Sequence, residues 1–172
     1  MHTDRLVLRP YRSDDANNLL HYYGRAEVSR YLLNEPWTLG TAREAVRARV
    51  SRRDLAEGAI ALVVEYEGRV VGDVAAWLVE GTEHTAELGW VFSPEFSGQG
   101  FASEAVTALV DHVLAEPRVH RVIAQMDARN SGSVRLAQRI GMRQEAHFQQ
   151  NLRIKNEWTD TLLFATLRSE RN

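Results

Sequence analysis

The chain has 172 residues, of which 44% are hydrophobic, 26% charged and 8% aromatic. This composition is typical of one ordinary soluble domain and excludes disordered, fibrous and membrane-spanning chains. The absence of cysteine excludes disulfides, thiolate metal sites and a cysteine nucleophile. With 21 Lys and Arg against 23 Asp and Glu, the formal charge is -2, so we expect no partner among nucleic acids or membranes. The expectation is a single cytoplasmic domain over 1–172 that binds any anion locally.

The first half of the chain predicts a strand, two helices and a hairpin. Residues 5–10 are rich in strand formers, and 13–15 have the pattern of a helix N-cap with acids in the first turn. Apolar residues then recur at helical spacing in two stretches that Pro36 and Gly40 separate. The predicted elements are a strand at 5–10, helices at 13–33 and 41–57, and hairpin strands at 59–66 and 70–79.

The second half alternates strands and helices. A strand at 85–92 leads through a glycine-bearing loop into a helix at 100–115 with one apolar face, which Pro117 ends. Successive hairpin-linked strands favour a mixed, largely antiparallel sheet over a doubly wound parallel one, so the fold class is α+β. The remaining predicted elements are strands at 120–127, 142–152 and 158–167 and a helix at 130–140.

The loop before the helix at 100–115 is the strongest chemical signal. Gly98 and Gly100 permit backbone conformations closed to other residues and let a ligand approach without meeting a Cβ atom. The first N–H groups of the helix lack intrahelical partners and lie at the positive end of its dipole, which suits a phosphate. The alternative is a tight turn that needs glycine for its own geometry. The dinucleotide fingerprint has a third glycine where this chain has Ser103, and the Gly-Lys-Ser/Thr of the P-loop is absent.

The strand at 85–92 carries the candidate base. Period-two alternation places its large apolar residues on one face, which we expect to lie in the core, and Glu87 on the other face beside Gly89. The alternative for Glu87 is a surface carboxylate on a half-solvated sheet. The face expected in the core consists of Ala86, Leu88, Trp90 and Phe92.

The segment 127–142 reads as a strand end, a helix start led by Asn130 and a stop at Gly141. As an N-cap, Asn130 requires no ligand. Ser133 lies near the same helix start.

Together these segments resemble the GNAT superfamily of acetyl-CoA-dependent N-acetyltransferases, and most of all its RimJ/RimL-like group, which acetylates ribosomal-protein N-termini. The resemblance spans nearly the whole chain and rests on 87–105 and 130–142. It implies a GNAT fold of six to seven strands and four main helices, splayed between its fourth and fifth strands to admit the pantetheine arm. It also implies acetyl-CoA as cosubstrate, a small-molecule or peptide amine as acceptor, and a monomer or homodimer.

The resemblance implies roles for particular residues. The loop from Gly98 to Ser103 corresponds to the pyrophosphate-binding loop, and the backbone of 91–93 to the edge that hydrogen-bonds pantetheine. Asn130 and Ser133 fall at the thiol end of the cofactor. The implied cofactor-binding residues are Val91, Phe92, Ser93, Gly98, Gln99, Gly100, Phe101, Ala102, Ser103 and Asn130.

Two positions depart from the family pattern. Glu95 stands where the loop pattern begins with Gln or Arg, and Ala137 stands where many members have a Tyr that protonates the leaving thiolate. Because the loop acts through backbone N–H groups, Glu95 weakens the motif match more than the chemistry. Ser133 is the hydroxyl that remains for the proton donor.

The expected chemistry is direct attack of an amine on the thioester, without a covalent enzyme intermediate. Glu87 takes the proton of the amine, directly or through one water. The Val91 N–H stabilises the oxyanion. A CoA thiol with the ordinary pKa of about 8.5 departs nearly unaided, so strong acid catalysis is optional.

The remaining candidates have weaker patterns. Arg135 and Arg139, one helical turn apart, are candidates for the 3′-phosphate of CoA, or else solvated surface arginines. His84 is a candidate acceptor contact because it is close to Glu87. The 6 histidines show no metal spacing, so no metal site is predicted. The aromatic residues expected to flank the acceptor cleft, or else to pack in the core, are Tyr31, Trp37 and Trp158.

Two other classes of function stay open from the sequence. Glu95 and Ala137 suggest a non-catalytic CoA-binding sensor or scaffold module, and the glycine loop alone fits a nucleotide-binding domain. The near-neutral charge does not distinguish a protein N-terminus from an aminoglycoside, a polyamine or an amino acid as acceptor.

Overall fold

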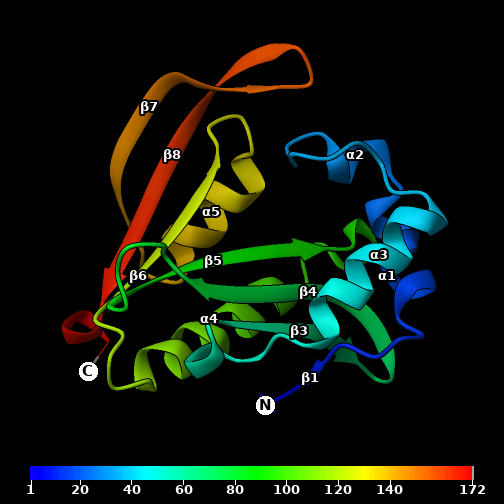
Figure 1. Ribbon diagram of the computed structural model, residues 1–172, viewed down its shortest axis with the longest axis horizontal. Helices are drawn as coiled ribbons and strands as arrows, with labels where there is room; N and C mark the ends of the chain where they lie inside the picture. The colour runs from blue at the N-terminus through cyan, green and yellow to red at the C-terminus, as the bar shows by residue number, and fades with distance from the viewer. Residues whose placement is uncertain (172) are drawn as a thin grey trace.

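The computed structural model describes residues 1–171, whose strands join into one mixed sheet (Figure 1). The strand order is β1-β3-β4-β5-β6-β8-β7, with β2 paired to β3 at the edge. Within the described chain only the β5–β6 pair is parallel. The strands are β1 (Val7–Pro10), β2 (Arg53–Asp54), β3 (Ala59–Tyr66), β4 (Arg69–Leu78), β5 (Thr85–Phe92), β6 (Arg121–Asp127), β7 (Arg143–Ile154) and β8 (Glu157–Leu167). The helices are α1 (Ala16–Tyr23), α2 (Ala26–Ser29), α3 (Leu39–Val50), α4 (Phe101–Ala115) and α5 (Ser131–Arg139).

Helices cover both faces of the sheet and enclose two apolar cores. The larger core includes Leu109 and Val113 of α4, packed with Val122 of β6. The smaller core lies under α1 and α3 and includes Leu19 and Val46. Each large aliphatic side chain buried in this way contributes about 1.5–3 kcal/mol, so both faces are held firmly.

β5 and β6 separate after a short paired segment. Their parallel pairs run from Thr85 with Arg121 to Leu88 with Ala124 and then stop, although β5 continues to Phe92. The sheet is therefore open beside the second half of β5.

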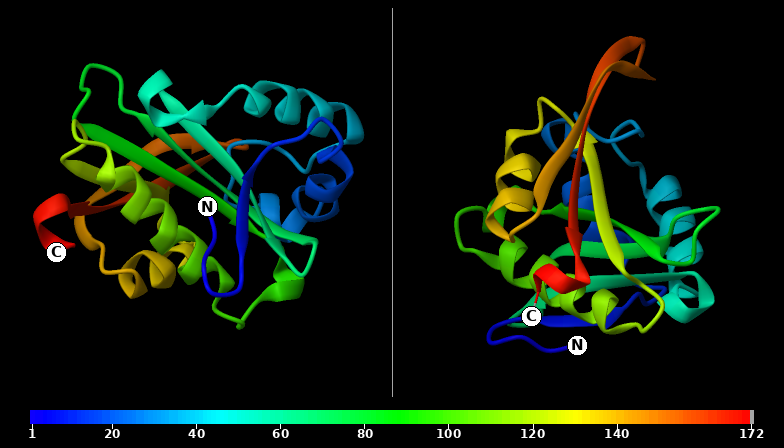
Figure 2. Two further views of the ribbon diagram at one scale, coloured as in Figure 1. Left: turned by 90° about the horizontal axis from the view of Figure 1, so that it is seen from below. Right: turned by 90° about the vertical axis from the view of Figure 1, so that its left-hand side faces the viewer.

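β7 and β8 form a long hairpin that projects beyond the rest of the sheet (Figure 2). Most residues of β7 are exposed. In Figure 1 the hairpin reaches toward α2, and at its tip Lys155 Nζ donates to the carbonyl of Ser29 at 2.7 Å. This bond links the hairpin to the helices on the other side of the opening.

The predicted helix at 13–33 is wrong in its extent. α1 begins only at Ala16, and the Asp15 side chain does not cap it. The Asp15 carboxylate instead accepts two hydrogen bonds from the Arg9 guanidinium, at 2.8 and 2.7 Å. α1 ends at Tyr23, and its C-cap is Gly24, where a Cβ atom would lie 2.8 Å from the carbonyl oxygen of Leu20. Only the single turn of α2 follows.

The predicted helix at 41–57 is displaced toward the N-terminus. Thr38 and Thr41 form a capping box that starts α3 earlier. After Val50 the chain enters β2 and pairs with the sheet. Leu55, only 3% exposed, is buried from a short 3-10 turn, so its apolar character reflects packing and not a continued helix.

The other predicted elements are confirmed within a few residues at their ends. The sheet is mixed and largely antiparallel, and the seven strands of its main path agree with the expected number. The four longer helices, α1, α3, α4 and α5, are those predicted. Within residues 1–171, no helix combines the length and apolar character needed to cross a bilayer.

Candidate active site

Two cavities meet at the opening beside β5. The strand cavity, which contains Glu87, has a volume of about 600 Å³. The loop groove, which runs along Gly98 to Ser103, has a volume of about 580 Å³. Trp90, Val91 and Ser133 line both, so the two cavities are continuous at this point.

The loop groove presents a row of backbone donors. Gly98 and Gly100 have φ values of +79° and +83°, in the left-handed region that glycine adopts without strain. Among residues 1–171, no protein group accepts a hydrogen bond from the N–H of any residue from Gly98 to Ser103. These donors precede and begin α4, where the helix dipole is positive. The arrangement fits a phosphate or pyrophosphate.

The structure brings together all but one of the residues predicted to bind the cofactor. Gln99 is the exception: it is not part of the lining, and its carbonyl accepts a hydrogen bond from Arg5 Nη1 at 3.0 Å. Ser93 is 2% exposed and its Oγ has no hydrogen-bond partner among the described residues. The residues of the prediction that line the groove are Val91, Phe92, Ser93, Gly98, Gly100, Phe101, Ala102, Ser103 and Asn130.

Arg5 is a neighbour of this loop that the sequence analysis missed. Its guanidinium lies 4.7 Å from the ring centroid of Phe101 and pairs with Glu104 in the first turn of α4. The bond to Gln99 joins residues 94 positions apart, so no local pattern predicts it. Arg5 therefore places a positive charge beside the loop.

The charged residues discussed for this groove divide into two groups. Arg135 and Arg139 are exposed and line the groove, as a contact with the 3′-phosphate requires. Glu95 lies outside the lining, because its carboxylate bonds to His21 Nε2 at 2.7 Å. The His21 contact lowers the pKa of Glu95, with nearby arginines adding to the effect. The departure at Glu95 thus leaves the backbone donors in place.

Glu87 lies half-buried in the strand cavity. Its Oε1 accepts a hydrogen bond from Gln125 Nε2 at 3.3 Å. Burial raises the pKa of Glu87, while donation from Gln125 and Trp77 partly offsets that rise. A carboxylate with a raised pKa inside a cavity is suited to accept a proton.

Trp77 forms the surface beside Glu87, and the sequence analysis missed it. In the β4–β5 pair Trp77 is opposite Glu87. Its ring also covers Gly89, where an added Cβ atom would lie 3.2 Å from the indole. The placement depends on the register across the turn at 79–84, which alternation within one strand does not determine.

Ser133 lies where the two cavities meet. Its Oγ accepts a hydrogen bond from Trp90 Nε1 at 3.2 Å, and its N–H donates to Asn130 Oδ1 at 3.1 Å. The prediction that Asn130 caps α5 is therefore confirmed. The Ser133 hydroxyl proton has no acceptor among residues 1–171 and is available to a ligand. Ala137 is fully buried and outside both linings.

Trp90 and Phe92 pack against the larger core, as predicted for their face, but they are only partly buried. Ala86 and Leu88 of the same face are buried, at 0% and 2% exposure. Trp90 and Phe92 lie past the end of the β5–β6 pairing, so both also line the loop groove.

The register also corrects the expected oxyanion donor. The Ser93 N–H donates to the Val71 carbonyl at 2.9 Å. Because bonded and non-bonded pairs alternate in an antiparallel ladder, the Val91 N–H, two residues earlier, also faces β4. The N–H groups of Trp90 and Phe92 face the other way, into the opening. The opening therefore receives its backbone donors from Trp90 and Phe92.

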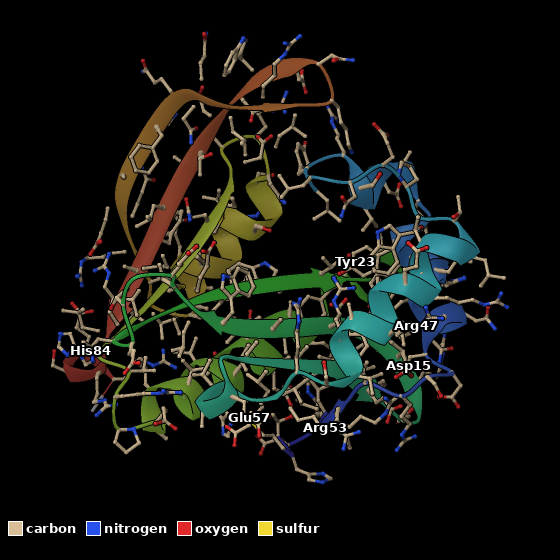
Figure 3. The ribbon with its side chains drawn as sticks, viewed as in Figure 1. Asp15, Tyr23, Arg47, Arg53, Glu57 and His84 are labelled. Carbon is tan, nitrogen blue, oxygen red and sulfur yellow. The ribbon has the colours of Figure 1, made fainter. Side chains whose placement is uncertain are left out.

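Of the remaining residues predicted near the acceptor, two line the strand cavity and two do not. Tyr31 and Trp37 line the strand cavity. Trp158 is 60% exposed and outside both linings. His84 contacts a backbone carbonyl through Nδ1 at 2.9 Å and lies at the opposite side of the molecule from Tyr23, which lines the cavity (Figure 3). His84 is therefore not an acceptor contact.

Asp73 forms a polar part of the cavity wall. Its carboxylate accepts hydrogen bonds from the hydroxyls of Tyr11, Tyr22 and Tyr23, at 2.8, 2.7 and 3.1 Å. Burial raises the pKa of Asp73, and the charge of Arg49 opposes that rise. The three tyrosines satisfy the carboxylate from within the core.

The chain matches known acetyltransferases over nearly its whole length. Residues 5–143 match the family model for the acetyltransferase (GNAT) domain. The chain is 32% identical over 170 residues to the uncharacterized N-acetyltransferase YnaD of Bacillus subtilis (strain 168), covering 99% of this chain and 98% of the relative. It is 29% identical over 177 residues to the [ribosomal protein uS5]-alanine N-acetyltransferase of Escherichia coli (strain K12), covering 95% and 88%.

Solved structures agree with these relatives. An acetyltransferase of the GNAT family from Bacillus anthracis superposes with a TM-score of 0.89 at 29% identity, covering 98% of both chains. RimL, the ribosomal L7/L12 alpha-N-protein acetyltransferase in complex with coenzyme A, has the same fold, with a TM-score of 0.84 at 18% identity and coverage of 96% and 95%. The chain therefore belongs to the GNAT acetyltransferase family and is an N-acetyltransferase.

Proposed function

We propose that this chain transfers the acetyl group of acetyl-CoA directly to a primary amine, with CoA in the loop groove and the amine in the strand cavity. The observation that carries the proposal is the row of unpaired N–H donors from Gly98 to Ser103, in a groove continuous with the cavity of Glu87. Relatives named for acetylation of a ribosomal protein and of spermidine support an amine acceptor.

The residues of the loop groove fit the parts of CoA. The backbone donors from Gly98 to Ser103 bind the pyrophosphate, and Arg135 and Arg139 bind the 3′-phosphate. The buried hydroxyl of Ser93 supplies a polar contact to the pantetheine arm. The thioester then lies at the junction of the two cavities, beside Ser133.

Glu87 acts as the general base. The amine nitrogen attacks the thioester carbon and loses a proton to the carboxylate. Glu87 and Trp90 are three residues apart, about 10 Å at the usual strand rise. We infer from this separation that the proton reaches Glu87 through an intervening water.

Backbone and side-chain donors from β5 and α5 complete the reaction. The N–H of Trp90 or Phe92, facing the opening, stabilises the oxyanion of the tetrahedral intermediate. The C–S bond then breaks, and the Ser133 hydroxyl, whose oxygen is held by the Trp90 indole, donates a hydrogen bond to the leaving thiolate. Any proton that Ser133 passes to the sulfur is replaced from solvent, so the serine ends the cycle as a neutral hydroxyl. The products are the N-acetylated amine and CoA.

Ligand-induced thermal stabilisation tests the cofactor assignment. A ligand at 100 times its Kd adds about 2.7 kcal/mol to stability. We expect acetyl-CoA and CoA to raise the Tm, and ATP and NAD to leave it unchanged. An unchanged Tm in saturating acetyl-CoA contradicts the proposal, and a shift with ATP alone favours a nucleotide-binding domain.

Release of the CoA thiol separates an enzyme from a sensor. We expect thiol release with at least one class among peptides, aminoglycosides, polyamines and amino acids. Stabilisation by acetyl-CoA without release for any amine favours the non-catalytic module.

A further inference from the structure

Some charged groups of the strand cavity have hydrogen-bond or ion-pair partners within the described part of the chain, and others do not. Asp73 is bound by three tyrosine hydroxyls, and Asp127 is paired with a neighbouring arginine at 2.7 Å. Glu87 is the proposed base. Arg49 and Arg52 also line the cavity, and neither guanidinium has a hydrogen bond or an ion pair within 4.0 Å among residues 1–171. The cavity therefore contains two cations with unused donors.

Aromatic rings hold Arg49 in place. Its guanidinium lies 5.2, 5.8 and 5.9 Å from the ring centroids of Trp37, Tyr11 and Tyr23. Trp37 and Tyr23 are themselves stacked, with centroids 3.8 Å apart. Contacts of this kind engage the flat face of a guanidinium and leave its N–H edge available. The Asp73 carboxylate attracts Arg49 but lies beyond ion-pair distance.

The part of the sheet between these arginines and Glu87 carries small residues. In the β3–β4–β5 register, Ala61 is opposite Ala75, and Ala75 is opposite Gly89. Ala75 and Gly89 both line the cavity. The Trp77 indole covers Gly89, so the room that this row leaves for a ligand between Glu87 and the arginines lies over Ala75.

We propose that Arg49 and Arg52 bind an anionic group on the acceptor, so that the preferred substrate is an amine that also carries a carboxylate or a phosphate. The inference rests on the proposed function and names its substrate class. Planar guanidinium groups match both oxyanions, and their bonds to an ionised partner are stronger than neutral ones. A polyamine brings a second cation to the same place and is disfavoured.

Matched acceptors test this inference. Thiol release is measured with glycylglycine and glycylglycinamide, with β-alanine and β-alaninamide, and with O-phosphoethanolamine and ethanolamine, with spermidine as a polycationic probe. For at least one pair we expect kcat/KM to be about tenfold higher for the anionic member. The carboxylate and phosphate pairs show which oxyanion is preferred.

Substitutions locate the effect at the arginines. Arg52→Gln removes an exposed side chain, and we expect it to lower the anionic preference while the Tm stays unchanged. Arg49→Gln is expected to lower the preference further, and Arg49→Lys, which keeps the charge but not the planar group, restores part of it. Arg47→Gln is the matched control, because Arg47 is exposed on α3 and outside the cavity lining (Figure 3).

Two results overturn this inference and leave the proposed function intact. One is acetylation of the neutral amides or of spermidine with kcat/KM equal to or above that of every anionic partner. The other is an anionic preference that Arg52→Gln and a folded Arg49 variant leave unchanged. Failure of acetyl-CoA to bind, or of every amine to react, overturns the proposed function and this inference with it.

Discussion

The two cavities are built in different ways. The loop groove is built around a row of backbone donors from one continuous segment, Gly98 to Ser103. The strand cavity takes its polar groups from side chains on separate elements, among them Arg49 on α3, Asp73 on β4 and Glu87 on β5. Backbone donors keep their place when the side chains change, so the groove is tied to one cofactor chemistry. The strand cavity can change its specificity by single substitutions.

Glu87→Gln should have the largest effect on the rate. It should change the chemistry in the strand cavity and leave cofactor binding in the loop groove unchanged. We expect kcat to decrease by about a hundredfold or more, since general base catalysis is typically worth that much. The Kd for CoA, measured by calorimetry, should stay the same because Glu87 is outside the loop groove. A variant with full kcat would exclude Glu87 as the base.

The pH dependence of kcat in the wild type and in Glu87→Gln gives a second test of Glu87 as the base. The base acts as a carboxylate, so the rate is full above the pKa of Glu87 and falls as the pH drops through it. Burial raises that pKa, which places the acid limb of the wild type above the usual glutamate value of about 4.3. Glu87→Gln should lack this limb.

Gly98→Ala should affect the loop groove alone. A residue other than glycine costs about 1–2 kcal/mol in the left-handed region, so the free loop shifts away from the conformation that binds. We therefore expect the Kd and KM for acetyl-CoA to rise about tenfold. The KM for the amine should stay the same. Gly68→Ala is the control: its φ of +74° and open surroundings impose the same strain in the β3–β4 turn, away from the groove. Equal effects on the Kd from both variants would refute a specific role for the loop.

Trp77→Phe should have a smaller effect that couples to Glu87. The phenyl ring keeps the cover over Gly89 but removes a donor that lowers the pKa of Glu87. We expect the acid limb to move to higher pH, with kcat near neutral pH reduced about two- to fivefold. An unmoved limb would show that Trp77 only fills space.

Ser133→Ala should have the smallest effect. A thiol with a pKa of about 8.5 leaves without much help, so we expect kcat to fall about threefold or less. A loss as large as that of Glu87→Gln would mean that protonation of the thiolate limits the rate. The comparison is best made by single-turnover measurements, in which release of CoA does not contribute.

The difference between the cavities also explains what the sequence could predict. The pattern from Glu87 to Ala105 contains a strand, its exposed face and a glycine turn in one stretch, so the loop groove follows from local rules. Trp77 and Gln125 meet Glu87 only through the register of β4, β5 and β6, and Arg49 lines the same cavity only through the position of α3. No spacing in one segment determines those contacts.

The errors in the fold have the same origin. Asp15 has the residue type of a cap, but a bidentate contact with Arg9 gives it another partner. Alternation correctly assigned the face of Trp90, yet the separation of β5 from β6 turned that face into a cavity wall. Likewise, the Val91 N–H is directed by its pairing with β4, which is invisible in the sequence of β5 alone.

The contact at the hairpin tip bears on chemical modification. Lys155 is the only lysine in the sequence, and its amine donates to the carbonyl of Ser29. An amine-directed reagent therefore has one side-chain target, at the place where β7 and β8 reach α2. For an enzyme that acylates amines, this composition leaves a single side chain of its own to compete with the substrate, and that amine is already engaged by a backbone carbonyl.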